Sequence, residues 1–276
     1  MLNSLADFNA KSYRESRLKE NFGLQGTGWI GLGRHYNNWM YKIRKTVLLR
    51  KMKSVRIDFN TADVLDIGSG IGFYIDIWKK LGAKGIVGID ITSMAVENLK
   101  RKYCSEEFFE VDIGDANLTY IRDRRYDIIS AFDVLFHIID DKRYETAIKN
   151  IYSLLKPNGI FIFSDNFLHG DTIRYGPQVS RSLQFIEKIL IQSEFEIVER
   201  CPVFVLMNTP VDTTRRMTKM FWAIITSLVH SDERRGLVIG GILYPLERLL
   251  VSLLRESPST ELMICKRSNF TESKTV

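Results

Sequence analysis

The stretch Val64–Gly72, with the sequence VLDIGSGIG, decides the fold of this chain. An apolar strand ends in an acidic residue, and glycine then occupies every second position, where it lets the backbone turn tightly and lets a ligand approach without meeting a Cβ atom. The amphipathic segment Phe73–Leu81 predicts a helix whose first amides point to the same place. The sequence therefore predicts a small-ligand site at the carboxyl end of a strand in an open α/β sheet.

The spacing of the glycines argues against a dinucleotide. The dinucleotide fingerprint G-x-G-x-x-G would require glycine at position 73, which is Phe73. Asp66 would also be a poor neighbour for a pyrophosphate, but its charge suits a ligand that carries an ammonium or a sulfonium group.

The run Asp66–Gly72 resembles the glycine-rich motif of class I S-adenosylmethionine-dependent methyltransferases, and further segments strengthen the resemblance. They follow in the order typical of that family, and each reads as a strand or as a helix end leading into one: Val87–Asp90, Phe108–Ile113, Tyr126–Asp133 and Leu154–Phe163. The resemblance covers roughly residues 60–205 and the final strand. Within that family, the chain resembles the bacterial methyltransferases that act on polysaccharides and natural products.

This resemblance implies an α/β fold with a Rossmann-like, seven-stranded and mostly parallel sheet whose last strand is antiparallel. We expect an N-terminal helical arm over 1–57 and a methyltransferase domain over 58–202 and 259–268. A helical insertion over 203–258 would join strands six and seven, where the family usually has a short hairpin.

The resemblance also implies S-adenosylmethionine as the cofactor and assigns residues to it. Asp90 with Ile91 would grip the ribose, and Asp112 with Ile113 would face the adenine. The remaining candidates come from the glycine-rich run and from the end of the fourth strand: Asp66, Gly68, Ser69, Gly70, Gly72 and Phe132.

The sequence says less about the residues that bind and activate the methyl acceptor. Enzymes that methylate planar nitrogens commonly carry Asp/Asn-Pro-Pro-Tyr/Phe after the fourth strand, and this chain has Asp133 followed by Val-Leu-Phe-His. An oxygen acceptor is therefore favoured, with His137 as the base and Asp133 beside it. A Mg²⁺ ion held by Asp133, Asp165 and Asn166 is a second, less favoured route. Substrate contacts are expected from Tyr36, His169, Arg174 and Arg181.

The insertion contains two apolar segments, Met217–Val229 and Gly236–Leu254. The second is long enough to raise the question of a membrane span, but Glu247 and Arg248 near its middle argue against one. We expect a helical hairpin that caps the acceptor site, because its connections leave and re-enter at the edge of the sheet that carries the site. The alternatives are a homodimer interface and a contact with a lipid surface.

Composition sets outer bounds. The chain has 276 residues and a net charge of +6, and its three cysteines show no C-x-x-C pattern. Residues 1–7 lack the pattern of a signal peptide, so we expect a cytoplasmic protein, with a location at the inner-membrane periphery kept open. The basic amphipathic segment Lys42–Arg56 suits an anionic membrane or an acidic substrate. Nucleic acid is not favoured, because no nucleic-acid module accompanies the charge.

These observations predict transfer of a methyl group to a hydroxyl of a glycan, a lipid-linked sugar or a secondary metabolite. Two alternatives stay open. One is a non-catalytic partner that keeps the cofactor pocket as a structural or regulatory site. The other is a small-molecule N-methyltransferase.

Overall fold

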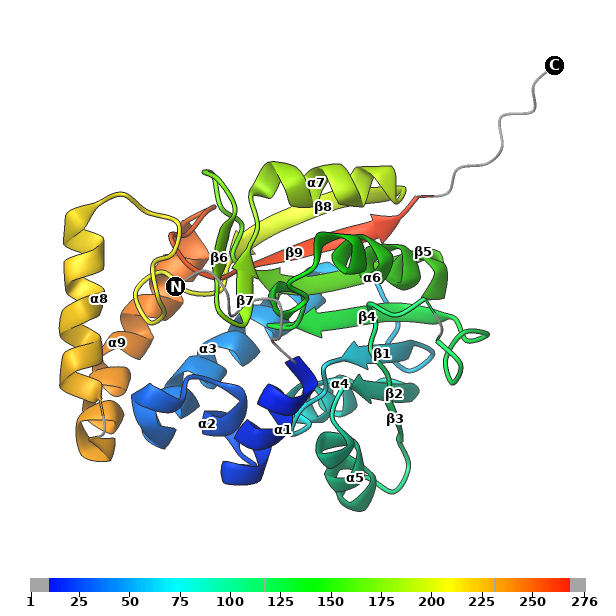
Figure 1. Ribbon diagram of the computed structural model, residues 1–276, viewed down its shortest axis with the longest axis horizontal. Coiled ribbons are helices and arrows are strands. Elements are labelled where there is room, and N and C mark those ends of the chain that lie inside the picture. The colour runs from blue at the N-terminus through cyan, green and yellow to red at the C-terminus, as the bar shows by residue number, and fades with distance from the viewer. Residues whose placement is uncertain (1–9, 117, 231, 269–276) are drawn as a thin grey trace.

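The computed structural model describes residues 10–268 except 117 and 231, so the segment that we inspected for a signal peptide lies outside the described residues. A seven-stranded sheet runs through the molecule in the order β3-β2-β1-β4-β5-β9-β8 (Figure 1). The last strand of the chain is antiparallel to both of its neighbours, and the other strand pairs are parallel. The predicted Rossmann-like fold is confirmed. Its strands are β1 (Asp63–Ile67), β2 (Gly85–Asp90), β3 (Glu107–Glu110), β4 (Tyr126–Phe132), β5 (Leu155–Asp165), β8 (Phe195–Pro202) and β9 (Glu261–Arg267).

Alternating side chains of the strands feed two cores, one on each face of the sheet. In β1, Val64 belongs to the core that includes α4 (Phe73–Leu81) and α5 (Ser93–Lys102). Its neighbour Leu65 belongs to the core on the opposite face, which includes α6 (Asp141–Leu154) and α7 (Leu183–Gln192). Burial on both faces explains why these strands read as continuous apolar runs.

The N-terminal segment is helical, as expected. It contains α1 (Ala10–Glu20), α2 (Leu24–Thr27), a 3₁₀ turn (Ile30–Leu32) and the long α3 (Gly33–Ser54). The third helix joins the core that contains α4, through buried residues such as Ile43 and Val47. The arm is therefore continuous with the domain core.

The insertion forms a helical hairpin, α8 (Arg216–Val229) and α9 (Glu233–Leu253). Pro202 of β8 pairs with Glu261 of β9, so the insertion leaves and re-enters at one edge of the sheet, as predicted. In Figure 1 α8 and α9 lie at the left, next to α3. Trp39 of α3 donates a hydrogen bond to the carbonyl of Leu237 at 3.0 Å, which ties the two helices together.

Two local features differ from the sequence prediction. The segment after β5 contains a short hairpin of β6 (Ile173–Tyr175) and β7 (Gln178–Ser180), which the sequence did not predict. The third strand was expected to reach Ile113 and ends at Glu110. It ends early because the Asp112 carboxylate accepts the amide of Gly114 at 2.8 Å, which begins a turn.

Gly240 should be essential for the packing of α9 on α3. A Cβ atom there would lie 2.4 Å from Cδ1 of Trp39, whereas a Cβ at Gly241 would lie 3.4 Å from Cζ2 of the same ring. We expect Gly240→Ala to lower the free energy of unfolding by about 1–3 kcal/mol through overpacking. Gly241→Ala is the matched control and should be neutral or stabilising, because alanine favours helix. Equal effects in urea denaturation would contradict this packing.

Candidate active site

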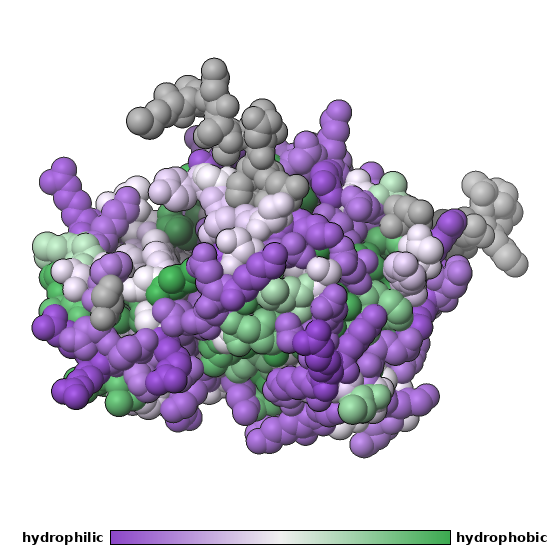
Figure 2. All heavy atoms as spheres, turned by 60° about the horizontal axis from the view of Figure 1, so that its bottom comes forward, coloured by the Kyte–Doolittle hydropathy of each residue, from purple (hydrophilic) through white to green (hydrophobic). Residues whose placement is uncertain are grey.

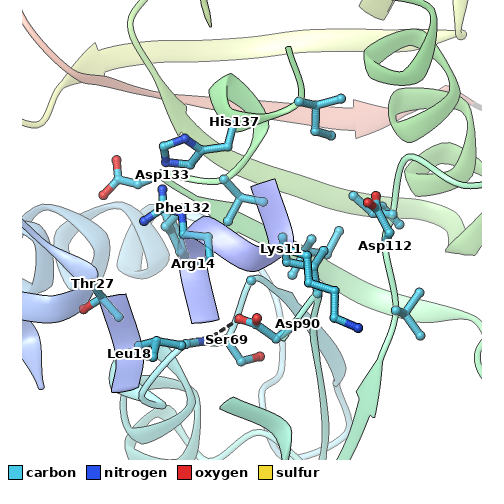
Figure 3. Close-up of a pocket in the computed structure, with 18 of the residues that line it drawn as sticks. Lys11, Arg14, Leu18, Thr27, Ser69, Asp90, Asp112, Phe132, Asp133 and His137 are labelled. Atoms are coloured by element: carbon cyan, nitrogen blue, oxygen red, sulfur yellow. Dashed lines mark hydrogen bonds between the residues drawn. The ribbon is translucent and has the colours of Figure 1, made fainter. Parts of the chain in front are cut away.

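A cavity of about 780 Å³ lies at the carboxyl ends of β1, β2 and β4. One wall is the glycine-rich loop after β1, and the opposite wall comes from α1 and α2 of the arm (Figure 3). Its volume lies within the range of small-molecule sites, roughly 300–1,000 Å³. The fold thus places a site where the sequence predicted one.

The glycine-rich loop has a conformation that requires glycine. Gly68, Gly70 and Gly72 have φ angles of 71°, 53° and 83°, a region that other residues rarely adopt. The first two glycines and Ser69 line the cavity. Gly72 does not. It precedes α4, and a Cβ there would lie 2.6 Å from the hydroxyl of Tyr103, so the expectation that it contacts the cofactor is corrected to a packing role.

Asp66 lies beneath the loop and is not among the residues that line the cavity. The hydroxyl of Ser130 donates to its Oδ1 at 2.6 Å, and its Oδ2 has no hydrogen-bond partner within the described residues. Burial raises the pKa of Asp66 to about 7. The structure therefore places this carboxylate against Ser130 of β4, where the sequence had predicted a cofactor contact.

The other residues predicted to hold the cofactor all line the cavity: Asp90, Ile91, Asp112, Ile113 and Phe132. The amide of Gly70 donates to Oδ2 of Asp90 at 3.0 Å, and Thr92 donates to its Oδ1 through amide and hydroxyl. Because each carboxylate oxygen can accept two bonds, Oδ2 keeps the capacity to accept a ligand hydroxyl.

Asp133 stands at the end of β4 in a left-handed conformation, with a φ angle of 58°. It forms an ion pair with Arg44, which is buried in α3. Ser164 of β5 also holds it, accepting the Asp133 amide and donating to its Oδ1, both at 2.9 Å. Residues held in such sparsely populated backbone conformations cluster at functional sites, which makes Asp133 a candidate functional residue. The sequence did not predict the part played by Arg44.

His137 lines the cavity close to Asp133 (Figure 3). Its Nδ1 lies 3.0 Å from the carbonyl oxygen of Pro177. A carbonyl only accepts, so Nδ1 carries the proton and Nε2 holds the lone pair. Burial, together with the nearby Arg14 cation, lowers the pKa of His137 well below its usual value, so the ring is neutral at physiological pH.

Residues of the arm complete the cavity, and sequence reasoning missed them. Lys11, Arg14 and Leu18 of α1 and Thr27 of α2 all line it. In Figure 3 Arg14 reaches toward Asp133 and His137. Burial lowers the pKa of Arg14 to about 10, which leaves it charged at neutral pH. The periodicity of α1 gave no signal, because two of its cavity-lining side chains, Lys11 and Arg14, are charged.

None of the four residues predicted to contact substrate lines the cavity. Tyr36 is fully buried, and its hydroxyl donates to the carbonyl of Met207, so its expected role is corrected to packing. Arg181 is also buried, against the ring of Tyr144 and the carboxylate of Asp141. These contacts hold the start of α6, and they correct the expectation for Arg181 as well.

The other two lie on the surface. Arg174 donates to the carbonyl of Ile139 and to Asp141. His169 contacts Asp212 through Nδ1 at 2.5 Å. That contact raises the pKa of His169. Both side chains therefore serve local structure in this conformation.

The residues weighed for a metal are all engaged by other groups of the protein. Asp133 is paired with a cation, and the Asn166 side chain is held by Ser180 at 3.2 Å and Thr260 at 3.2 Å. Asp165 is buried and accepts the amide of Asn166. In the part of the chain that the structure describes, no three His, Cys, Asp or Glu side chains cluster as a metal would need.

The described residues of the insertion do not line the cavity, which corrects the expectation of a cap. The arm covers the site in its place. Between the sheet and α9 lies α3, which presents Tyr41 to the cavity and Trp39 to the insertion. The insertion therefore supports the arm from outside.

Comparison with known proteins agrees with this geometry. Residues 65–163 match the model of a methyltransferase domain. Over 102 residues the chain is 36% identical to the ribosomal protein L11 methyltransferase of Dictyoglomus thermophilum, covering 37% of this chain and 32% of that protein. The mRNA cap guanine-N(7) methyltransferase of Schizosaccharomyces pombe is 25% identical over 139 residues, 47% of this chain and 37% of that one. The chain thus spans about a third of the length of these curated relatives.

Two solved structures share the fold over almost the whole chain. The N-methyltransferase NodS of Bradyrhizobium japonicum, in complex with S-adenosylhomocysteine, gives a TM-score of 0.55 at 16% identity, covering 94% of this chain and 99% of that one. The magnesium protoporphyrin IX methyltransferase of Synechocystis, with bound S-adenosylmethionine, gives a TM-score of 0.55 at 15% sequence identity. That match covers 95% of this chain and 99% of that one. The matching model identifies residues 65–163 as a methyltransferase domain, and the sheet order and glycine-rich loop give it the fold of S-adenosylmethionine-dependent methyltransferases.

The buried Asp66 should make stability depend on pH. Its pKa is about 7 in the folded chain and near 3.8 when unfolded, so the folded state holds the extra proton between these values. The contribution of Asp66 to the free energy of unfolding is therefore greatest below pH 4, and it falls as the pH rises to about 7. Relative to the wild type, Asp66→Asn should gain on the order of 2–3 kcal/mol between pH 5 and pH 8.

Urea denaturation of both proteins at the two pH values measures this difference. Asp165, whose pKa burial also raises to about 7, is present in both proteins and cancels. A difference that stays the same at pH 5 and pH 8 would show that Asp66 ionises normally in the folded chain.

Proposed function

We propose that this protein transfers the methyl group of S-adenosylmethionine to a hydroxyl oxygen of its acceptor. The observation that carries the proposal is the arrangement of His137, which lines the cavity with its proton fixed on Nδ1 by the Pro177 carbonyl. That leaves a neutral Nε2 as a base beside the end of β4.

The residues around the cavity fit the cofactor. Gly68 and Gly70 bring bare backbone to its wall, Asp90 retains acceptor capacity for ribose hydroxyls, and Asp112 stands at the next strand end. When bound, S-adenosylmethionine supplies an electrophilic methyl group on a sulfonium. The carboxylate of Asp90 on this wall would favour a cationic ligand.

A hydroxyl acceptor must lose its proton as its oxygen bonds to carbon. The Nε2 of His137 would take that proton, and the charge of Arg14 would stabilise the negative charge that develops on the oxygen. Arg44 and Ser164 would hold Asp133 still, so the acceptor meets a fixed wall. We infer an acceptor of the kind that the sequence suggested, a glycan, a lipid-linked sugar or a secondary metabolite.

Amine methylation is the second candidate, and the similarity to proteins named as N-methyltransferases favours it. A neutral amine attacks with its own lone pair and needs no base in the transfer step. The two chemistries therefore predict different effects of removing His137.

Asp90→Ala should weaken S-adenosylhomocysteine binding more than tenfold, because losing a charged hydrogen bond costs on the order of 1.5–3 kcal/mol. Titration calorimetry measures this directly and needs no acceptor. Asp58→Ala, at an exposed turn outside the cavity, is the control and should bind as the wild type does. Unchanged affinity in Asp90→Ala would place the ribose elsewhere. A wild type that binds neither S-adenosylmethionine nor its product would refute the proposed function.

His137→Ala should lower methyl transfer to a hydroxyl by roughly 10²–10⁴-fold, the usual contribution of a general base. Cofactor affinity should hardly change. Transfer is followed with tritiated S-adenosylmethionine and a small-molecule and lipid extract of the source cells, and mass spectrometry assigns the label to oxygen or nitrogen. His230→Gln, on the exposed end of α8, is the matched control. Full transfer by His137→Ala, or label on nitrogen alone, would reject the hydroxyl mechanism.

A further inference from the structure

The helical hairpin α8–α9 presents an apolar face to solvent that no part of the described chain covers. On α9 an exposed stripe recurs every three or four residues through Val238, Ile242, Leu246, Leu249 and Leu253. On α8 a second stripe follows Met217, Met220, Ile224 and Leu228. Figure 2 shows hydrophobic surface at the left edge of the molecule, the side on which Figure 1 places these helices.

This stripe is separate from the one that packs α9 against the protein. The inward side of the helix buries Gly240, Leu243 and Val251, with Gly240 against Trp39 of α3. The outward side keeps large apolar residues exposed, with Ile242 at 68%. A soluble protein rarely leaves such a continuous apolar face without a partner.

Length and composition alone would let α9 cross a membrane, with a mean hydropathy of 1.5, but its contacts argue otherwise. Glu247 near its middle is fully buried and accepts the amides of Val205 and Leu206 at 2.7 and 2.9 Å. Arg50 of α3 also donates to the carbonyl of Val251 at 2.7 Å. The helix is therefore fixed on the domain along its length and offers only its outer face.

The acidic and the basic side chains of the hairpin have different surroundings. Its acidic side chains bond to backbone amides of the protein: Asp232 caps α9, Glu233 binds the first amides of α3, and Glu247 is buried. Basic side chains point outward around the apolar face, at Arg216, Lys219, Arg234 and Arg248. The face is thus apolar with a basic border.

We propose that the outer face of α8–α9 docks on an anionic lipid bilayer, with both helices lying in the headgroup region. An apolar face bordered by lysine and arginine is the pattern of an interfacial helix. In a symmetric pair of copies the same patch would face itself and bring its basic border against an identical one, which disfavours a dimer. The proposal holds for either acceptor chemistry, and it gives the enzyme access to acceptors held at a membrane.

Flotation with lipid vesicles tests the proposal. The wild type should bind vesicles that contain phosphatidylglycerol and bind pure phosphatidylcholine at least about tenfold more weakly. High salt should release part of the bound protein. The double variant Ile242→Glu/Leu249→Glu should lose binding to both kinds of vesicle, because a carboxylate in the apolar face opposes its burial among lipids. Ile191→Glu, at an apolar position of α7 that is 64% exposed, is the matched control and should float like the wild type.

A second variant protects the test against misfolding. Arg216→Gln/Lys219→Gln changes charge only, and it should weaken binding to the anionic vesicles severalfold while calorimetry with S-adenosylhomocysteine matches the wild type. Equal flotation of the wild type and the Ile242→Glu/Leu249→Glu protein would overturn the proposal. A wild type that binds no vesicles and forms a dimer that Ile242→Glu/Leu249→Glu disrupts would also overturn it. A wild type that stays in the membrane after both salt and carbonate extraction would show that the protein spans the bilayer, which overturns the proposal as well.

Discussion

The ion pair between Arg44 and Asp133 is the contact on which the arrangement of the site depends. It joins the middle of α3 to the end of β4, and Arg44 is buried while Asp133 borders the cavity. Removing one partner of such a pair leaves a charge without compensation, which is far more costly than the pair itself is stabilising. The pair thus fixes the arm in one position on the sheet, and the arm in turn supplies the wall that α1 and α2 form.

The same helix connects the site with the insertion. One side of α3 carries Tyr41, which lines the cavity, and Arg44, which pairs with Asp133. Another side carries Trp39, which bonds to α9. Close approach at Gly240 and the hydrogen bond to Leu237 make α9 a continuation of the domain. A partner bound to the outer face of α9 would therefore be one helix away from α3. The helix α3 in turn holds Asp133 through Arg44. The arm is the physical link between the hairpin surface and the chemistry.

The sequence was a good guide wherever backbone conformation or strand order determines the structure. The glycine run and the carboxylates at the ends of β2 and β4 follow from local patterns that a parallel sheet brings to one edge, and the family resemblance implied the antiparallel last strand. It was a poor guide to side chains whose direction depends on distant packing. Tyr36 and Arg181 belong to residue types that often contact substrates, yet contacts with Met207 and Tyr144 bury them. Arg14 drew no prediction and Arg44 lay unmarked within the basic segment Lys42–Arg56, and only the fold of the arm brings the first to the cavity and the second to Asp133.

The basic segment Lys42–Arg56 shows why composition alone could not assign a partner. Arg44 pairs with Asp133, Arg50 donates to the carbonyl of Val251, and Lys51 pairs with Glu199, so these three charges serve the fold. Lys42 sits over the ring of Trp39 at 3.8 Å, beside α9. The charge that could meet an anionic surface is therefore found mainly on the insertion, where the acidic side chains of the hairpin bond to backbone amides and exposed basic side chains border the apolar face. A count of charges along the chain cannot separate these two uses, because the difference lies in which basic side chains the fold pairs with acidic groups of the protein.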